Sequence, residues 1–154
     1  MKVRYARKSD IKIGVDLGAV MWAESSFISS DYSKEKLYKW AEALIDDENG
    51  FVAVAVDDND ILFGMYLGCI VQHFFGNSTY ATDYLWFVEP TKRGGMAAVK
   101  LLKKFEEWAK ERGASELRPG ISTGIYMDKT KGLYERLGYE HVGYLFKKQI
   151  EKEA

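Results

Sequence analysis

The chain has 154 residues, of which 47% are hydrophobic and 29% charged, so it can bury one full core and suits a single domain. Its 22 basic and 23 acidic residues leave a formal net charge of −1, which gives no electrostatic support for nucleic-acid binding. Because Cys69 is the only cysteine and the histidines number two, we expect neither a disulfide framework nor a metal site.

The N-terminal half alternates short apolar runs with amphipathic stretches. The predicted elements are a strand at 1–7, helices at 11–24 and from Ser33 to about residue 46, and strands at 51–56 and 61–75. The two strands are joined by an acidic hairpin turn at 57–60. This order predicts a sheet with two helices inserted after its first strand.

The C-terminal half continues with a strand at 79–88 that is apolar on both faces, which predicts a central strand covered on both sides. Strict alternation places its even-numbered residues on one face and its odd-numbered residues on the other. The remaining predicted elements are a long helix after Arg93, a strand at 116–118, a loop at 120–127, a helix at 129–137, and a last strand or hairpin from Tyr139 to Ile150. The order β-α-α-β-β-β-α-β-α-β predicts an α/β fold, a mixed sheet with helices on both faces.

Arg93, Gly94 and Gly95 form a basic, glycine-rich turn between the central strand and the long helix. A helix N-terminus offers unpaired N–H groups and a positive dipole end, so this turn predicts an anion site. An ordinary strand-to-helix turn with a surface arginine is the alternative. The turn alone does not separate the two.

Two motifs make the chain resemble the Gcn5-related N-acetyltransferase (GNAT) family. The first motif runs from Val88 to Ala98 (VEPTKRGGMAA) and is similar to the family's strand end and pyrophosphate loop. The second runs from Gly132 to Tyr139 (GLYERLGY) and is similar to another segment of the family. About 40 residues separate them, as in the family. The resemblance implies one GNAT-like acyl-CoA-binding domain over residues 1–154, with a mostly antiparallel central sheet.

The resemblance also implies acetyl-CoA as co-substrate. The residues it assigns to cofactor binding are Phe87, Val88, Arg93, Gly94, Gly95, Met96, Ala97 and Ala98. The central strand would splay from its neighbour after Arg118 and pair with the pantetheine arm. Met96 stands where the family usually has glycine, but a helix-opening residue has negative φ and can still offer its N–H.

For catalysis, the resemblance implies Tyr134 as the general acid that protonates the departing thiolate, whereas the alternative is a core tyrosine. Asp83 is the first candidate for the base, with Glu89 and Glu24 behind it and a solvated charge as the alternative for each. No activated cysteine or serine constellation suggests a covalent intermediate, so we expect direct attack by an amine in a ternary complex.

Trp22, Glu24, Ser25 and Phe27 lie where the family's first helix meets the loop that lines the acceptor site. They are candidate substrate-binding residues, with Glu24 attracting a cationic amine, whereas packing of the helix pair is the alternative. Similar segments recur in phage and prophage members, which suggests a phage-like protein.

The predicted function is therefore N-acetyl transfer from acetyl-CoA to a primary amine of a small molecule or protein. The alternatives are a catalytically weak or inactive GNAT-fold module that binds, for example, a host protein, and a plain oligomeric scaffold. The family often dimerises through its last strands, so the resemblance makes a homodimer one open alternative for the oligomeric state. We expect no nucleic-acid partner and no membrane partner. The N-terminus lacks the apolar core of a signal peptide and no apolar run approaches about 18 residues, so we expect a cytoplasmic protein.

Overall fold

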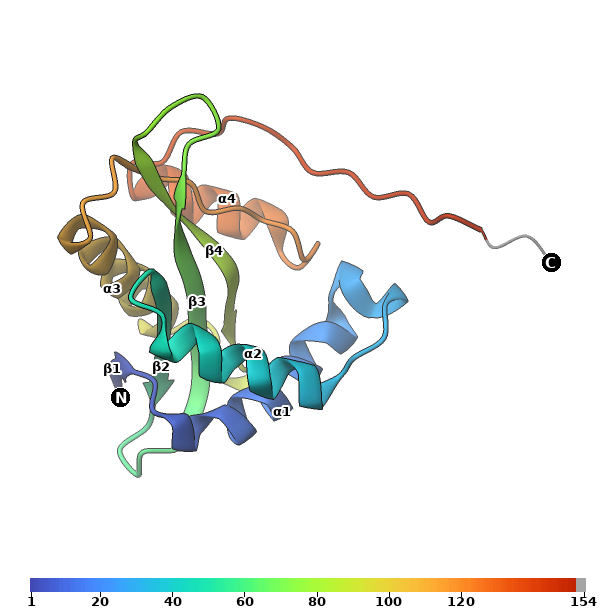
Figure 1. Cartoon of the computed structure of the whole chain (residues 1–154). Helices are drawn as coiled ribbons and strands as arrows, with labels where there is room; N and C mark the ends of the chain where they lie inside the picture. The colour runs from blue at the N-terminus through green and yellow to red at the C-terminus, as the bar shows by residue number, and fades with distance from the viewer. Residues whose placement is uncertain (152–154) are drawn as a thin grey trace.

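The computed structural model describes residues 1–151 and contains one five-stranded sheet in the order β1-β2-β3-β4-β5 (Figure 1). The strands are β1 (Lys2–Tyr5), β2 (Gly50–Val56), β3 (Leu62–Gln72), β4 (Thr79–Val88) and β5 (Glu116–Leu117). The first four pair antiparallel, and β5 runs parallel to β4. The predicted mixed, mostly antiparallel sheet is therefore confirmed.

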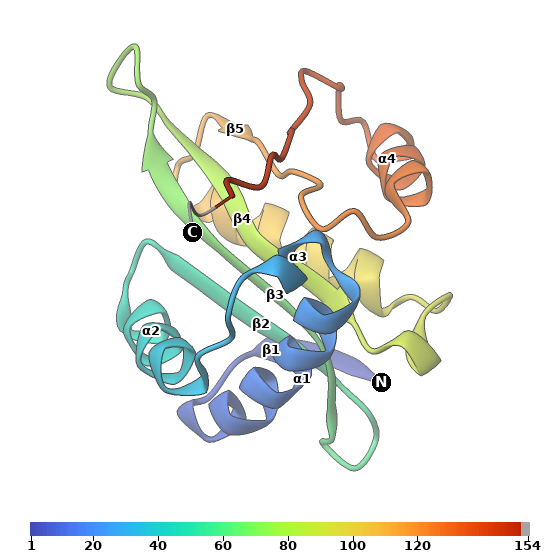
Figure 2. The ribbon, with the colours of Figure 1, turned by 90° about the vertical axis from the view of Figure 1, so that its right-hand side faces the viewer.

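Helices cover both faces of this sheet, as predicted. The four α-helices are α1 (Ile11–Glu24), α2 (Lys34–Asp46), α3 (Ala97–Glu111) and α4 (Met127–Arg136), and short 3-10 helices span η1 (Lys8–Asp10), η2 (Ser26–Ser29) and η3 (Pro90–Lys92). In Figure 2, α1 and α2 lie in front of the sheet and α3 lies behind it. Each face buries its own apolar core, one around Met65 and Leu67 and the other around Phe105 and Trp108.

Local signals place several of these elements. The Ser33 side chain accepts a hydrogen bond from the N–H of Lys36 at 3.2 Å and so caps α2. In the hairpin turn, the Asp57 carboxylate accepts from the N–H of Asn59 at 2.8 Å. Helix α4 begins at Met127, two residues before the predicted start, and none of the helices described is long and apolar enough to cross a membrane.

The predicted alternation along β4 is wrong in its second half, because the strand contains a β-bulge. Gly68 pairs with Asp83 and Leu67 pairs with Leu85, so Tyr84 is the extra residue. An extra residue reverses the facing of every side chain that follows it. Leu85 and Phe87 consequently pack toward α1 and α2, whereas Trp86 and Val88 pack toward α3 and α4.

Strands β4 and β5 separate almost as soon as they pair, as the family resemblance implies. Their register has two residue pairs, Tyr80 with Glu116 and Ala81 with Leu117, and it ends at a bond from the N–H of Arg118 to the Ala81 carbonyl. Beyond this point the structure, over residues 1–151, gives the 83–88 segment of β4 no neighbour on that edge. Its backbone groups can therefore pair with something other than a strand of the sheet.

The predicted last strand from Tyr139 to Ile150 is not formed in the part of the chain that the structure describes. Residues 140–151 run extended and leave the body of the molecule (Figure 1). Val142, Tyr144 and Phe146 are 69%, 77% and 92% exposed. A strand needs a paired edge to be stable, and the two-residue β5 offers little edge to this segment within the same chain.

Candidate active site

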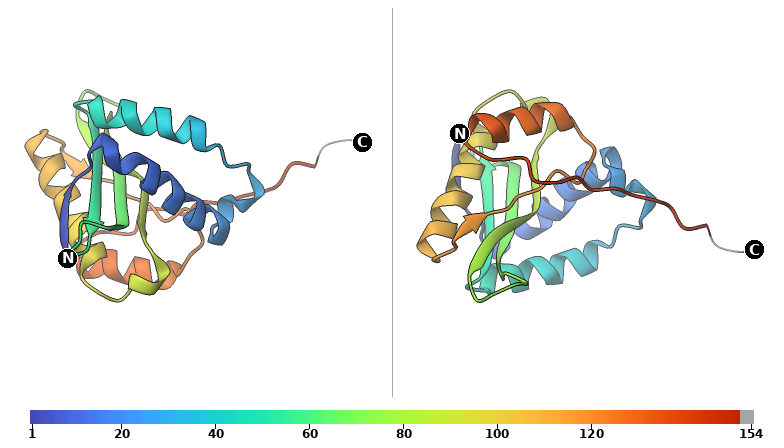
Figure 3. Two further views of the ribbon diagram at one scale, coloured as in Figure 1. Left: turned by 90° about the horizontal axis from the view of Figure 1, so that it is seen from below. Right: turned by 90° about the horizontal axis from the view of Figure 1, so that it is seen from above.

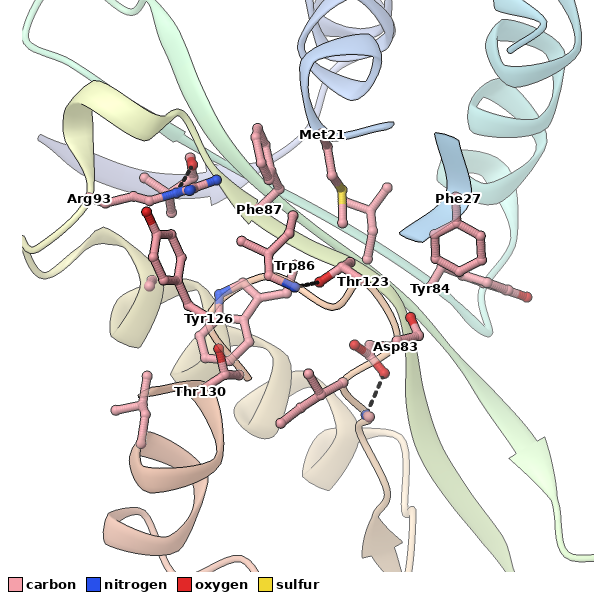
Figure 4. A pocket seen from close by; sticks show the side chains of 18 residues that line it. Met21, Phe27, Asp83, Tyr84, Trp86, Phe87, Arg93, Thr123, Tyr126 and Thr130 are labelled. Atoms are coloured by element: carbon pink, nitrogen blue, oxygen red, sulfur yellow. Dashed lines mark hydrogen bonds between the residues drawn. The ribbon is translucent and has the colours of Figure 1, made fainter. Parts of the chain in front are cut away.

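A cleft of about 200 Å³ opens where β4 loses its neighbour (Figure 4). Its floor is the 83–88 segment of β4, and its walls come from the loop after β5, the ends of α1 and η3, and the starts of α3 and α4. The separation of β4 from β5 thus creates the cleft. Phe87, Val88, Arg93 and Ala98, all predicted cofactor residues, lie on its surface.

The glycine-rich turn has the geometry that a backbone anion site needs. Gly94 has φ +93°, a conformation that favours glycine, and a Cβ on Gly94 or Gly95 would meet no atom within 4 Å. Met96 is the N-cap of α3 with φ −87°, so the negative φ predicted for it is present. The first helical bond runs from the N–H of Lys100 to the Met96 carbonyl, and the preceding N–H groups of Ala97 and Ala98 remain available.

Arg93 turns away from this backbone and toward the sheet. Its Nε donates to the Val88 carbonyl at 2.9 Å, and its guanidinium lies 5.1 Å from the centre of the Phe87 ring. Its Nη2 pairs with the Glu24 carboxylate at the end of α1. The structure therefore pairs Arg93, predicted to bind the cofactor, with Glu24, predicted to bind the substrate. Each side chain neutralises the charge of the other.

Asp83 is the only one of the three candidate carboxylates that lines the cleft. It is half-buried, its Oδ1 accepts from the N–H of Gly120 at 2.9 Å, and burial raises the pKa of its carboxyl above the ordinary value (Figure 4). Glu89 instead accepts from the Thr91 hydroxyl at 2.6 Å in η3. Glu24 is held by Arg93.

Tyr134 is buried in the core beneath the cleft and is not among the residues that line it. Its ring centroid lies 5.4 Å from that of Trp86, which does line the cleft, and 5.1 Å from that of Tyr139. Its hydroxyl finds no hydrogen-bond partner in residues 1–151. Burial, with the nearby Asp83 as a smaller cause, raises the pKa of Tyr134 well above its usual value.

Trp22, Ser25 and Phe27 lie beside a second cavity, between α1, α2 and the sheet. The Trp22 Nε1 donates to the Ser30 carbonyl at 3.2 Å. The buried Ser25 hydroxyl donates to the Trp22 carbonyl and accepts from the N–H of Phe27 at 3.1 Å, which fixes the turn into η2. Phe27 is half-exposed and lines both the cleft and the second cavity.

Sequence reasoning missed several residues that line the cleft. Among them are Tyr84, Trp86, Thr123, Ile125, Tyr126 and Thr130. Tyr84 enters through the bulge, for which Gly68 in the paired strand was the available signal, since a Cβ there would lie 2.6 Å from the Thr82 carbonyl oxygen. The residues after Gly120 lie in a loop without periodicity, which carries no such signal.

Comparison with known proteins agrees with this architecture. The sequence matches the Acetyltransferase (GNAT) family over residues 17–139. A protein named IAA acetyltransferase from Azospirillum brasilense is 31% identical over 80 residues, which cover 52% of this chain and 51% of that protein. The match thus spans about half the length of that relative.

Solved structures share the fold at low sequence identity. The structure of AAC(6')-Iy with a bisubstrate analogue, CoA-S-monomethyl-acetylneamine, matches with a TM-score of 0.78 and 15% identity over 98% of both chains. Glucosamine-6-phosphate N-acetyltransferase from Arabidopsis thaliana matches with a TM-score of 0.74 and 15% identity over 97% of this chain and 98% of that one.

The fold is that of a GNAT domain. The family match covers most of the chain, and the chain therefore belongs to the GNAT acetyltransferase family. Members of this family use acetyl-CoA as the acetyl donor.

Proposed function

We propose that this protein is an N-acetyltransferase that transfers the acetyl group of acetyl-CoA to a primary amine of a small molecule or protein, by direct attack in a ternary complex. One observation carries the proposal. The unpaired edge of β4, the N-terminus of α3 and the Asp83 carboxylate all border one cleft. A donor, an acceptor and a base can therefore meet in one place.

The residues present fit an acyl-CoA. The free edge of β4 up to Phe87 can pair with the amides of a pantetheine arm, as a ligand strand would. The N–H groups from Gly95 to Ala98 can donate to a pyrophosphate, assisted by the α3 dipole. Arg93 supports this site indirectly, because its bonds to Val88 and Glu24 hold the loop against β4 and α1. When bound, acetyl-CoA supplies the electrophilic carbonyl.

Asp83 is the proposed base. An amine attacks only after it has lost its ammonium proton, and the Asp83 carboxylate faces the cleft from which the amine must approach. Burial raises the pKa of this carboxyl, and a base whose pKa lies nearer neutrality retains the proton better than an exposed aspartate does. The N–H of Gly120 keeps the carboxylate oriented.

Tyr134 is the proposed donor to the departing sulfur. Its hydroxyl has no other partner among the described residues. Because burial raises its pKa further above that of a thiol, near 8.5, complete proton transfer to a thiolate is unfavourable. A hydrogen bond that stabilises the thiolate fits the environment better. The deep burial of this hydroxyl favours the second candidate function, a slow or inactive binding module, which weak turnover would support.

A second copy of the chain is the proposed protein partner. The extended 140–151 segment exposes Val142, Tyr144 and Phe146 at alternate positions, the pattern of a strand with one apolar face. Exchange of such a segment between identical chains would pair it at little cost. Lys147 ties the segment to the acceptor side of the molecule through a 2.7 Å bond to the Ser26 carbonyl.

Two measurements test the proposed function. Calorimetric titration with acetyl-CoA should show binding, which a plain scaffold lacks. A thiol-release assay over amines and peptides should then show release that depends on both substrates. Binding of acetyl-CoA without acceptor-dependent release would favour the binding module, and absence of both would overturn the proposal.

A further inference from the structure

The second cavity is larger than the cleft, at about 420 Å³, which lies within the range of small-molecule pockets. It is lined by residues of α1, α2 and the face of the sheet that these helices cover. Figure 3 shows α1 and α2, in blue and cyan, on this side of the sheet. Its inner wall is apolar. Among the residues that form this wall are Leu37, Trp40, Met65, Leu67 and Leu85.

Two glycines of α1 leave part of this space open. Gly14 and Gly18 stand one turn apart and line the cavity, so α1 carries no side chain at these two positions, while Val15 between them also lines it. A Cβ on Gly14 would make only an ordinary contact, 3.9 Å from the Met65 sulfur, whereas a Cβ on Gly18 would lie 2.5 Å from the Tyr32 hydroxyl, so the open space lies beside Gly14. Ordinary protein cores close such gaps by packing at high density, so a space of this size between helices suits a ligand.

The cavity and the cleft share Met21, Phe27, Tyr84 and Leu85. The bulge at Tyr84 forms this junction, because it turns Leu85 toward the cavity side of the sheet while Asp83, two positions earlier, lines the cleft. A molecule whose body lies in the cavity can therefore reach the cleft with one end, on the side of Asp83.

The cavity offers little for a polycation. Three charged residues touch it, and of these Asp10 is engaged by Arg4 in hydrogen bonds of 2.8 and 3.0 Å. Asp31 and Lys36 are exposed. Glu24, which lies between Met21 and Phe27 of the junction in the sequence, has its charge neutralised by Arg93. A substrate with several ammonium groups would lose hydration here and gain one carboxylate, the exposed Asp31, in return.

We infer that this cavity binds the body of the acyl acceptor, and that the acceptor is a monoamine with an aromatic or branched apolar body rather than a polyamine or an aminoglycoside. The inference rests on the proposed function, because it assigns the substrate class of the same site. The apolar body would be buried against Trp40 and Met65. The amine, as the one polar end, would lie beside Asp83.

A substitution that fills the cavity tests this assignment, together with a matched control on the same helix. Ala41 lines the cavity from α2, whereas Ala43, two residues on, is exposed. We expect 2-phenylethylamine to be acetylated with a kcat/KM at least about tenfold above that of spermidine or neamine. Ala41→Phe should raise KM for 2-phenylethylamine about tenfold or more and leave KM for acetyl-CoA unchanged, whereas Ala43→Phe should change neither.

The outcomes separate the two proposals. Faster acetylation of spermidine or neamine, or an Ala41→Phe variant that behaves like Ala43→Phe, overturns the cavity assignment and leaves acetyl transfer in place. If acetyl-CoA does not bind and no thiol is released, the proposed function fails. Calorimetric titration of 2-phenylethylamine alone then decides the cavity assignment, which requires binding that is lost in Ala41→Phe and kept in Ala43→Phe.

Discussion

Replacement of Asp83 by asparagine separates base catalysis from every other role of this position. Asn is nearly isosteric with Asp, and its side-chain oxygen can still accept from the N–H of Gly120, so the bond now measured at 2.9 Å can survive. Only the ability to take a proton is lost. General-base catalysis typically contributes about 10²–10⁴-fold, so Asp83→Asn should lower kcat/KM by that factor, or raise the barrier by about 2.7–5.5 kcal/mol.

The same substitution should not weaken the fold. Burial raises the pKa of Asp83 in the folded state, so the folded protein binds more protons than the unfolded chain between the ordinary aspartate pKa and the raised one. The stability that this carboxyl contributes is therefore fully present below the pKa that Asp83 has in the unfolded chain. It is lost as the pH rises through the higher pKa that Asp83 has in the folded protein. Asp83→Asn removes that loss, and its melting temperature at neutral pH should equal or exceed that of the unaltered protein.

The assay is the pH dependence of kcat/KM with saturating acetyl-CoA, read beside a thermal melt of both proteins. The unaltered enzyme should lose activity toward acidic pH as Asp83 is protonated, and Asp83→Asn should lack this acid limb. A variant that keeps both the limb and the rate would show that another group, or solvent, takes the proton. A variant that melts early would instead show that the carboxylate holds the fold.

Three further predictions concern the other parts of the site. Tyr134→Phe should lower kcat about 10- to 100-fold, the value of one hydrogen bond to a charged group, with little change in acetyl-CoA affinity by calorimetry, and an unchanged kcat removes this tyrosine from the mechanism. Gly94→Ala forces a side chain to φ +93°, so it should cost about 1–2 kcal/mol and weaken acetyl-CoA binding, whereas Gly76→Ala, at an open site, should do neither. Phe146→Asp should shift the sedimentation behaviour of the protein from dimer to monomer, and a dimer that persists in this variant would exclude the exchanged segment.

The elements that the sequence predicts well are those fixed by neighbours in the chain. Helix α2 follows from a serine cap and an apolar stripe, and β4 with its glycine-rich turn follows from a run of apolar residues that ends in proline. The interactions responsible lie within a few residues of one another. Periodicity and turn chemistry report on such interactions directly.

The features that the sequence does not predict depend on partners far along the chain. The bulge at Tyr84 exists only in the pairing of β3 with β4, and the family resemblance, rather than any local pattern, suggested that β4 and β5 separate. The ion pair of Arg93 with Glu24 spans 69 residues. The segment ending at Ile150 has a strand's composition, but a strand also requires an edge, and composition does not supply one.

The pairing of Arg93 changes how the glycine-rich turn is understood. From sequence, its arginine reads as a point charge for a phosphate, and its methionine reads as a defect in the motif. In the structure, Arg93 bonds the Val88 carbonyl and its charge is paired with Glu24, so the main donors that the turn offers to an anion are the backbone N–H groups at the start of α3. Such donors need a backbone conformation rather than a particular side chain. Gly94 meets that need with its positive φ, and Met96, at φ −87°, has a backbone conformation open to any residue and offers its N–H without requiring glycine.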